Sequence, residues 1–323
     1  MQNWPEERRA RTAEIAVAGS LREGPAKLRI NGSACATNDR PFMTTTQLIL
    51  NMDLARRIEL AEAQAAVETA EALTISRPES GAAVERMAGG FAVYCGANSP
   101  LTQAVGLGLE GPVNEEEFSR LEGFYRARNE PVRVETCPLA DASLIGHFGE
   151  RSYRVAEFTN VMARPINRAG AEQWSAPADG VSIEAAEPKH MELWALTVAQ
   201  GFAESYPVTQ ELLEVMRLFA SGQNATCYLA RVDGKVAGGA TLALRNGVAG
   251  LFGASTLPAF RGRGVQTALL HARLARAQEK GSDLAVCLAQ PGSISQRNVV
   301  RQGFQVLYTR VKFEKDFGAS KNQ

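Results

Sequence analysis

The sequence predicts an α+β protein with two domains of one fold, each a mixed, mostly antiparallel sheet flanked by helices. Its length of 323 residues exceeds the ~100–200 residues of a typical single domain. Short β-type runs and segments with helical spacing follow one another in both halves. Their order in the second half repeats their order in the first.

The repeat becomes visible when the first half is moved along the second by 151 positions, so that Ser152 falls on Gly303 (303 − 152 = 151). Strands then meet strands and helices meet helices without a gap. The matched apolar pairs include Phe118 with Leu269, Val134 with Ala285, Val155 with Val306 and Met162 with Phe313. This period is much longer than that of solenoid repeats, so it indicates two domains.

Four segments follow from this reading. Residues 1–42 show no sustained period and predict a disordered extension. We name residues 43–165 the first repeat and residues 181–318 the second repeat. Residues 166–180 between them are rich in Ala, Gly, Pro and Ser and predict a linker.

The first repeat predicts helices and strands in alternation. A helix over 48–73 has Asn51 or Asp53 as its candidate cap, and a helix over 115–125 has Asn114 as cap and three glutamates in its first turn. The other expected elements are strands at 90–95, 104–109, 131–137 and 153–162 and a helix at 141–150.

The second repeat opens with a strand at 181–185 and two helices, at 188–203 and 209–219, the latter capped by Thr209. Asp233–Gly234 is the strongest hairpin signal of the chain and joins strands at 225–232 and 236–244. A strand at 248–256, a helix at 265–278 and a strand at 285–289 follow.

Composition narrows the functional classes. Lys plus Arg equals Asp plus Glu, at 35 each, which predicts no general attraction to nucleic acid or to a membrane surface. Three histidines and the absence of a C-x-x-C pair argue against a metal site. The five cysteines predict reduced core thiols of a cytoplasmic protein.

The glycine-rich stretch PAFRGRGVQ, residues 258–266, lies between a predicted strand and a predicted helix. The first amides of a helix have no intrahelical partner and favour an anion. Gly262 and Gly264 permit positive φ and close approach of the backbone, and Arg261 and Arg263 add positive charge. The nucleotide P-loop pattern is missing, and Thr267 stands where a dinucleotide fingerprint would need glycine. A turn that only connects is the plain alternative.

This stretch resembles the acyl-CoA pyrophosphate loop of the GCN5-related N-acetyltransferase (GNAT) family, written R/Q-x-x-G-x-G/A. Further matches are AVCLA at 285–289, GSISQRN at 292–298 and RQGF at 301–304, which resemble the family's fifth strand, fourth helix and following Gly-Phe. The resemblance covers roughly residues 181–315. Gln266 departs from it, because the family usually has Gly or Ala there.

The resemblance implies an acetyltransferase that binds acetyl-CoA as co-substrate in a gap between the strand ending at Thr256 and the strand at 285–289. Backbone amides at the end of the first of these strands would polarise the thioester, and Gly253 marks a possible bulge there. The expected cofactor-binding residues are Ala254, Ser255, Thr256, Arg261, Gly262, Arg263, Gly264, Val265, Gln266, Thr267, Ser295 and Asn298.

The catalytic groups are not identified by the sequence. Many family members carry a tyrosine general acid where this chain has Val299, and Tyr308 is a weak substitute or a packed strand aromatic. Asn298 is equally well explained as a surface residue of its helix. Glu204 and Tyr206 lie in the loop that resembles the substrate-facing loop of the family, although an ordinary exposed Glu and a packed Tyr also explain them.

The first repeat has Glu110, Gly111, Pro112 and Val113 where the second has the loop of Arg261 to Gly264. Pro112 has no N–H, and Glu110 would repel a phosphate. We therefore expect the first repeat to lack the pyrophosphate loop and to support the second.

Two functions remain open on the sequence. One is an N-acetyltransferase that moves an acetyl group to a small-molecule or peptide amine by direct attack in a ternary complex. The other is a non-catalytic acyl-CoA-binding or scaffold protein that acts through partners. The acceptor and the oligomeric state are not specified.

Overall fold

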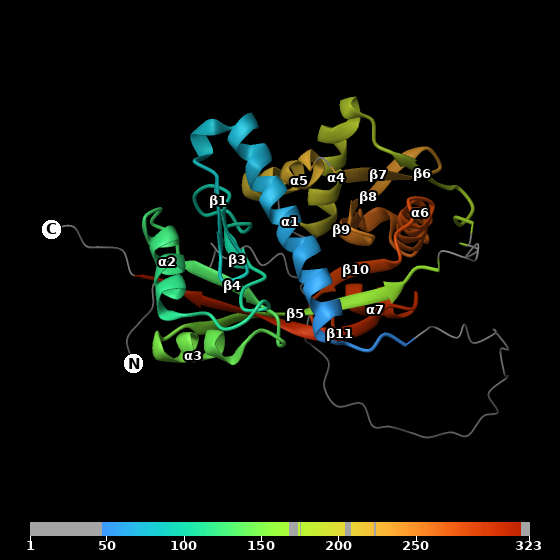
Figure 1. Cartoon of the computed structure of the whole chain (residues 1–323). Coiled ribbons are helices and arrows are strands. Elements are labelled where there is room, and N and C mark those ends of the chain that lie inside the picture. Colours follow the sequence, from blue (N-terminus) through green and yellow to red (C-terminus); the bar gives the residue numbers. More distant parts are fainter. Residues whose placement is uncertain (1–46, 168–173, 175, 204–207, 223, 318–323) are drawn as a thin grey trace, which may run out of the picture.

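The structure is a computed structural model that describes residues 47–167, 174, 176–203, 208–222 and 224–317. The predicted extension at 1–42 and the residues Glu204 and Tyr206 lie outside these ranges. Figure 1 shows the chain, with the helix α1 running diagonally between the strands of the two repeats.

The strands form one continuous 11-stranded sheet in the order β1-β2-β3-β4-β11-β5-β10-β9-β8-β7-β6. Only β3 with β4 and β9 with β10 pair in parallel; the other neighbours are antiparallel. This confirms the mostly antiparallel mixed sheet. The strands are β1 Ala83–Met87, β2 Gly90–Tyr94, β3 Gln103–Val105, β4 Val132–Thr136, β5 Arg154–Pro165, β6 Val181–Ala185, β7 Ala225–Val232, β8 Lys235–Arg245, β9 Val248–Thr256, β10 Leu284–Ala289 and β11 Gln305–Lys315.

Helices cover both faces of the sheet. Leu229 of β7 packs in one cluster with α4, whereas the next residue, Ala230, packs in the cluster of α6. Successive strand residues point to opposite faces, so α4 and α6 lie on opposite sides. The helices are α1 Met52–Ser76, α2 Glu115–Arg126, α3 Ala142–Glu150, α4 Met191–Phe202, α5 Gln210–Ser221, α6 Val265–Glu279 and α7 Ile294–Val300, with short 3₁₀ turns η2 Pro78–Ser80, η3 Pro188–His190 and η4 Pro258–Phe260.

The predicted repeat appears in the element order, because α2, β4, α3 and β5 of the first repeat recur as α6, β10, α7 and β11 of the second. The sheet adds a feature that the sequence did not predict. β5, from the first repeat, lies between β10 and β11, and β11, from the second repeat, lies between β4 and β5. The repeats have thus exchanged their last strands, and their sheets are one.

The local signals of the sequence hold in most places. Asn51 Oδ1 accepts the Leu54 amide at 2.8 Å, and Thr209 caps α5. Asn114 forms a full capping box with Glu117. Asp233 and Gly234 have φ of +50° and +77°, which is the geometry of a two-residue hairpin turn.

Two expectations need correction. The strand expected over 104–109 ends at Val105, because Gly106 and Gly108 have φ of +74° and +72° and turn the chain. β1 was not predicted, and it pairs with β2 through a tight turn at Ala88–Gly89.

The cysteines of the described chain are free and buried: Cys95, Cys137, Cys227 and Cys287. Burial raises the pKa of the Cys95 and Cys287 thiols to about 12. Among the helices of the described ranges, none is long and apolar enough to cross a membrane. The same residues contain no group of His, Cys, Asp and Glu that could hold a metal ion.

Candidate functional site

A gap opens between β9 and β10 at their carboxyl ends. The two strands pair in parallel from Leu284 opposite Val248 to Cys287 opposite Leu251. β9 continues to Thr256 and β10 to Ala289 without further pairing between them in the described structure. The backbone groups on the two facing edges are therefore available to a ligand.

β9 bulges where it leaves β10. Its register with β8 shifts between Gly239 opposite Ser255 and Thr241 opposite Phe252. Gly253 lies in this shift with φ of +55°, a conformation that glycine adopts without strain. The bulge expected at Gly253 is thus present and bends β9 at the gap.

The last residues of β9 use their side chains for packing. Ser255 is buried, and its Oγ donates to the Val198 carbonyl of α4 at 2.9 Å. Ala254 is half-buried. Thr256 is 6% exposed, and its Oγ1 has no hydrogen-bond partner within the described chain. An unsatisfied buried hydroxyl is costly, so a polar ligand atom at this end of the gap would stabilise it.

The loop after β9 leads into a helix with an open N-terminus. Gly262 and Gly264 have φ of +75° and +79°. Gly264 is the N-cap of α6, and no side chain of the described residues caps the helix there. Val265, Gln266 and Thr267 form the first turn, which contains no acidic residue. Such a turn favours an anion such as a phosphate group.

The two arginines of the loop are held by neighbouring elements. Arg263 Nη2 donates to Asp233 Oδ2, in the β7–β8 turn, at 3.2 Å. Arg261 Nη2 donates to the carbonyl of Gly201, near the end of α4, at 3.3 Å. Both side chains are exposed. An exposed ion pair stabilises by only about 0–1 kcal/mol, so Arg263 can leave Asp233 for an anion.

α7 carries the two predicted cofactor contacts that lie outside the loop and β9. Ser295 is exposed, and Asn298 is half-buried and accepts from Arg301 Nη1 at 3.5 Å, the outer limit for a hydrogen bond. Val299, at the position of the missing tyrosine, packs against the core cluster of α6.

Tyr308 is a packed strand aromatic. It is 6% exposed, and its hydroxyl donates to Glu59 Oε1 of α1 at 2.6 Å. Burial, together with the negative charge of Glu59, raises the pKa of Tyr308. β5 separates its strand from β10, so the structure gives Tyr308 no place at the gap.

Glu59 belongs to a buried charged cluster that sequence reasoning missed. Arg310 donates to Glu59 Oε1 from Nε at 3.0 Å and from Nη2 at 2.9 Å, and to Glu62 Oε2 from Nη1 at 2.7 Å. Burial raises the pKa of Glu59, although the charge of Arg310 opposes this. These partners are about 250 positions apart, and no local pattern links them.

The equivalent region of the first repeat is closed. After β3 the chain buries Leu107, Leu109 and Val113. The N-terminus of α2 is occupied, since Asn114 Oδ1 accepts the Glu117 amide at 2.9 Å and the Glu117 carboxylate accepts the Asn114 amide at 3.2 Å. Three glutamates in the first turn would also repel phosphate.

The part of the chain that contains the gap and the loop is similar to known proteins. Residues 191–304 match the family model described as the acetyltransferase (GNAT) family. This segment is a GNAT domain. The matched residues run from α4 to Phe304 and include the gap and the loop, so the enzyme class is that of the acetyltransferases.

Two solved structures share the fold over most of the chain. A GCN5-related N-acetyltransferase from Kribbella flavida has a TM-score of 0.60 at 18% identity, covering 82% of this chain and 96% of its own. A tandem GNAT protein from the clavulanic acid biosynthesis pathway has a TM-score of 0.55 at 15% identity, covering 84% and 98%. These likenesses concern the fold. No curated protein matches the sequence.

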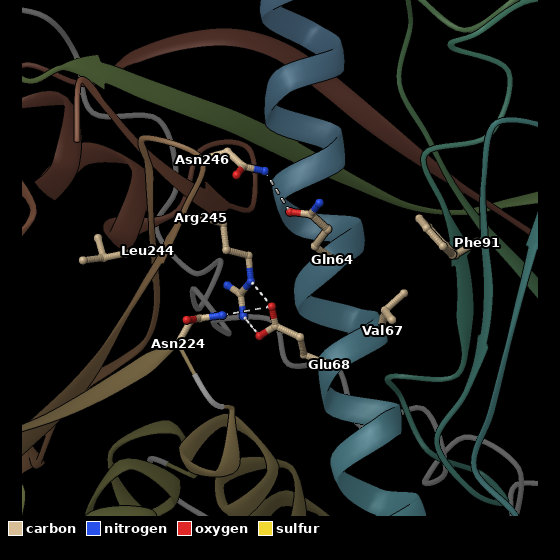
Figure 2. Close-up of a pocket in the computed structure, with 8 residues that line it drawn as sticks. All are labelled: Gln64, Val67, Glu68, Phe91, Asn224, Leu244, Arg245 and Asn246. Atoms are coloured by element: carbon tan, nitrogen blue, oxygen red, sulfur yellow. Dashed lines mark hydrogen bonds and ion pairs between the residues drawn. The ribbon is translucent and has the colours of Figure 1, made fainter. Parts of the chain in front are cut away.

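A separate cleft of about 460 Å³ lies where α1 meets the GNAT domain. Figure 2 shows Glu68 of α1 facing Arg245 and Asn224, and Gln64 facing Asn246. Arg245 binds the Glu68 carboxylate at 2.6 and 3.1 Å. The cleft adjoins the start of β9, whereas the gap is at its end, so the two are distinct. Its lining residues are Gln64, Val67, Glu68, Phe91, Asn224, Leu244, Arg245 and Asn246.

Proposed function

We propose that the chain is an acetyl-CoA-dependent N-acetyltransferase with one cofactor site, in the second repeat. The observation that carries this proposal is the uncapped N-terminus of α6 directly after the gap between β9 and β10. The first repeat, which has the same element order, has its corresponding helix capped and acidic. Only one of the two sites therefore suits a pyrophosphate.

The residues around the gap fit acetyl-CoA from one end to the other. The amides of the first turn of α6 and the loop glycines would hold the pyrophosphate, with Arg261 and Arg263 adding charge. The free edges of β9 and β10 would bind the amide groups of the pantetheine arm. The hydroxyl of Thr256, buried without a described partner, would gain a hydrogen bond.

The chemistry we propose is direct attack. The nitrogen of a neutral amine bonds to the acetyl carbon while the carbon–sulfur bond breaks and CoA leaves as a thiolate. The nitrogen then loses one proton and the thiolate takes up one, so that the products are the amide and the CoA thiol. The amides of Ala254, Ser255 and Thr256 would stabilise the charge that develops on the carbonyl oxygen. Holding both reactants in one gap supplies the proximity that the reaction needs.

Titration calorimetry with acetyl-CoA tests the site. Gly264→Val should abolish binding, because its Cβ would crowd Ala178 at 3.3 Å and its φ of +79° is strained for valine. Gly281→Val at the other end of α6 is the matched control, with φ of +76° and open space around it. It should bind like the wild type.

Release of CoA thiol in the presence of a panel of amines then identifies the acceptor class. If the wild-type chain fails to bind acetyl-CoA, the proposal is wrong. Binding without turnover on any amine would instead favour a non-catalytic acyl-CoA-binding protein.

A further inference from the structure

We infer, on the basis of the proposed function, that the first repeat takes part in acetyl-CoA binding by supplying β5 as the strand that holds β10. The site then belongs to both repeats, and the second repeat alone does not form it. This gives the first repeat a role at the site although its own corresponding region is closed.

β10 is the side of the gap that depends on β5. All six residues of β10, from Leu284 opposite Pro165 to Ala289 opposite Asn160, pair with β5. Only the first four pair with β9. At Leu288 and Ala289, where the gap is open, β5 is the only strand of the described chain that pairs with β10. The position of this wall is therefore set by the first repeat.

β5 is fixed firmly within the second repeat. Asn160, opposite the end of β10, is 6% exposed and accepts from Thr309 Oγ1 of β11 at 2.7 Å. Met162 is fully buried in the core cluster of α6. At the other end, the Ile166 amide donates to the backbone carbonyl of Asp283, just before β10, at 2.8 Å, and Arg164 Nη1 donates to the Gln302 carbonyl at 3.1 Å.

The exchange is reciprocal. β11 of the second repeat pairs with β4 of the first from Val311 opposite Thr136 to Lys315 opposite Val132. Separating the repeats would expose the edges of both β4 and β10 and the apolar residues beside them. Each repeat thus completes the sheet of the other, and neither last strand can be removed without loss of the neighbouring sheet.

A cysteine placed on β5 tests the exchange directly, after a protease site has been inserted within residues 168–173. Cys287 of β10 is opposite Met162 of β5. With the 151-residue offset (162 + 151 = 313), Phe313 would be opposite Cys287 if β11 lay in place of β5. Directly opposite residues on antiparallel strands have Cα atoms about 4.5–5.5 Å apart, within the range of a disulfide.

The full-length variants are refolded in a thiol–disulfide buffer, cleaved, and run on a non-reducing gel. Met162→Cys should give fragments joined by a reducible link, and the wild type should not. In a sheet without the exchange, Cys287 would be opposite position 313 of its own fragment, so the fragments of Met162→Cys would separate. A second pair, Val161→Cys with Leu288→Cys, uses the more exposed position 288 and should also link the fragments. If the fragments of Met162→Cys and those of the Val161→Cys, Leu288→Cys pair both remained separate, the exchange of strands would be overturned.

Acetyl-CoA titration of the cleaved wild-type chain tests the shared site. Cleaved but associated fragments should bind like the intact chain. After separation in urea, the second fragment refolded alone should bind more than about tenfold more weakly, and refolding with the first fragment should restore affinity. Tight binding by the second fragment alone would overturn the shared site. If the intact chain itself does not bind, the proposed function fails, while the disulfide result still decides the exchange.

Discussion

At the scale of single residues, Arg310 joins the two repeats through buried charged contacts. Its guanidinium is 4% exposed and binds Glu59 and Glu62 of α1, and Tyr308 donates to the same Glu59. A buried ion pair of this kind contributes little net stability compared with apolar residues, but losing one partner leaves a charge without compensation. The cluster fixes α1 of the first repeat on the last strand of the second.

Arg310→Met should therefore lower the free energy of unfolding by about 3–5 kcal/mol. Urea denaturation at pH 7 measures it. Adding Glu59→Gln to this variant should recover part of the loss, because it removes the uncompensated charge. Arg276→Met, which breaks an exposed pair with Glu279 at 2.8 Å, is the control and should change little. If Arg310→Met and Arg276→Met lowered the free energy of unfolding by similar amounts, this account would be contradicted.

Glu68 should make stability depend on pH. The hydrogen bond from Arg245 lowers the pKa of the Glu68 carboxyl, although burial opposes it. A folded-state pKa below the unfolded value means that the pair stabilises the protein above the ordinary glutamate pKa of about 4.3. That contribution is lost as the pH falls through the lower folded-state value.

Glu68→Gln should accordingly reduce stability most near pH 7 and least at acid pH. Urea unfolding of wild type and variant at several pH values measures the difference between them. A difference that stays constant from neutral to acid pH would show that the ion pair has no part in it.

At the scale of elements, the contrast between the two equivalent helices α2 and α6 carries the functional argument. α2 begins at a capping box with acidic residues, and α6 begins at a glycine without a side-chain cap from the described residues. The first end is built for stability, and the second leaves its amides to a ligand.

Asn114→Ala should cost about 1 kcal/mol of stability through loss of the α2 cap. It should leave acetyl-CoA affinity unchanged, because α2 is outside the proposed site. Denaturation and calorimetry on the same preparation give both values. If Asn114→Ala weakened acetyl-CoA binding without lowering the stability, the ligand would bind at α2 and the proposed site at α6 would be wrong.

Local signals in the sequence predicted these helix ends well. Each of these features depends on a few neighbouring residues, so the sequence alone could predict it. They are the caps Asn51, Asn114 and Thr209, the Asp233–Gly234 turn and the glycine loop. The pairing of strands could not be predicted from the sequence. β5 and β11 have the same pattern at an offset of 151, and either strand beside β10 would satisfy that pattern.

At the scale of the whole molecule, the two repeats act as one body. The sheet runs through both, and α1 of the first repeat joins the second through Arg310, Arg245 and the pair of Arg57 with Asp283. The division at residues 166–180 is therefore a division of sequence, and the proposed site draws on both sides of it.

The most direct test of the central claim is hydrogen–deuterium exchange of the intact chain with and without saturating acetyl-CoA. We predict slower exchange at the end of β9, at residues 261–268, and in β10 with its partner β5. The equivalent segment of the first repeat, residues 103–117, should not change. Protection of residues 103–117 instead, or no protection in the second repeat, would contradict a single acetyl-CoA site in the gap between β9 and β10.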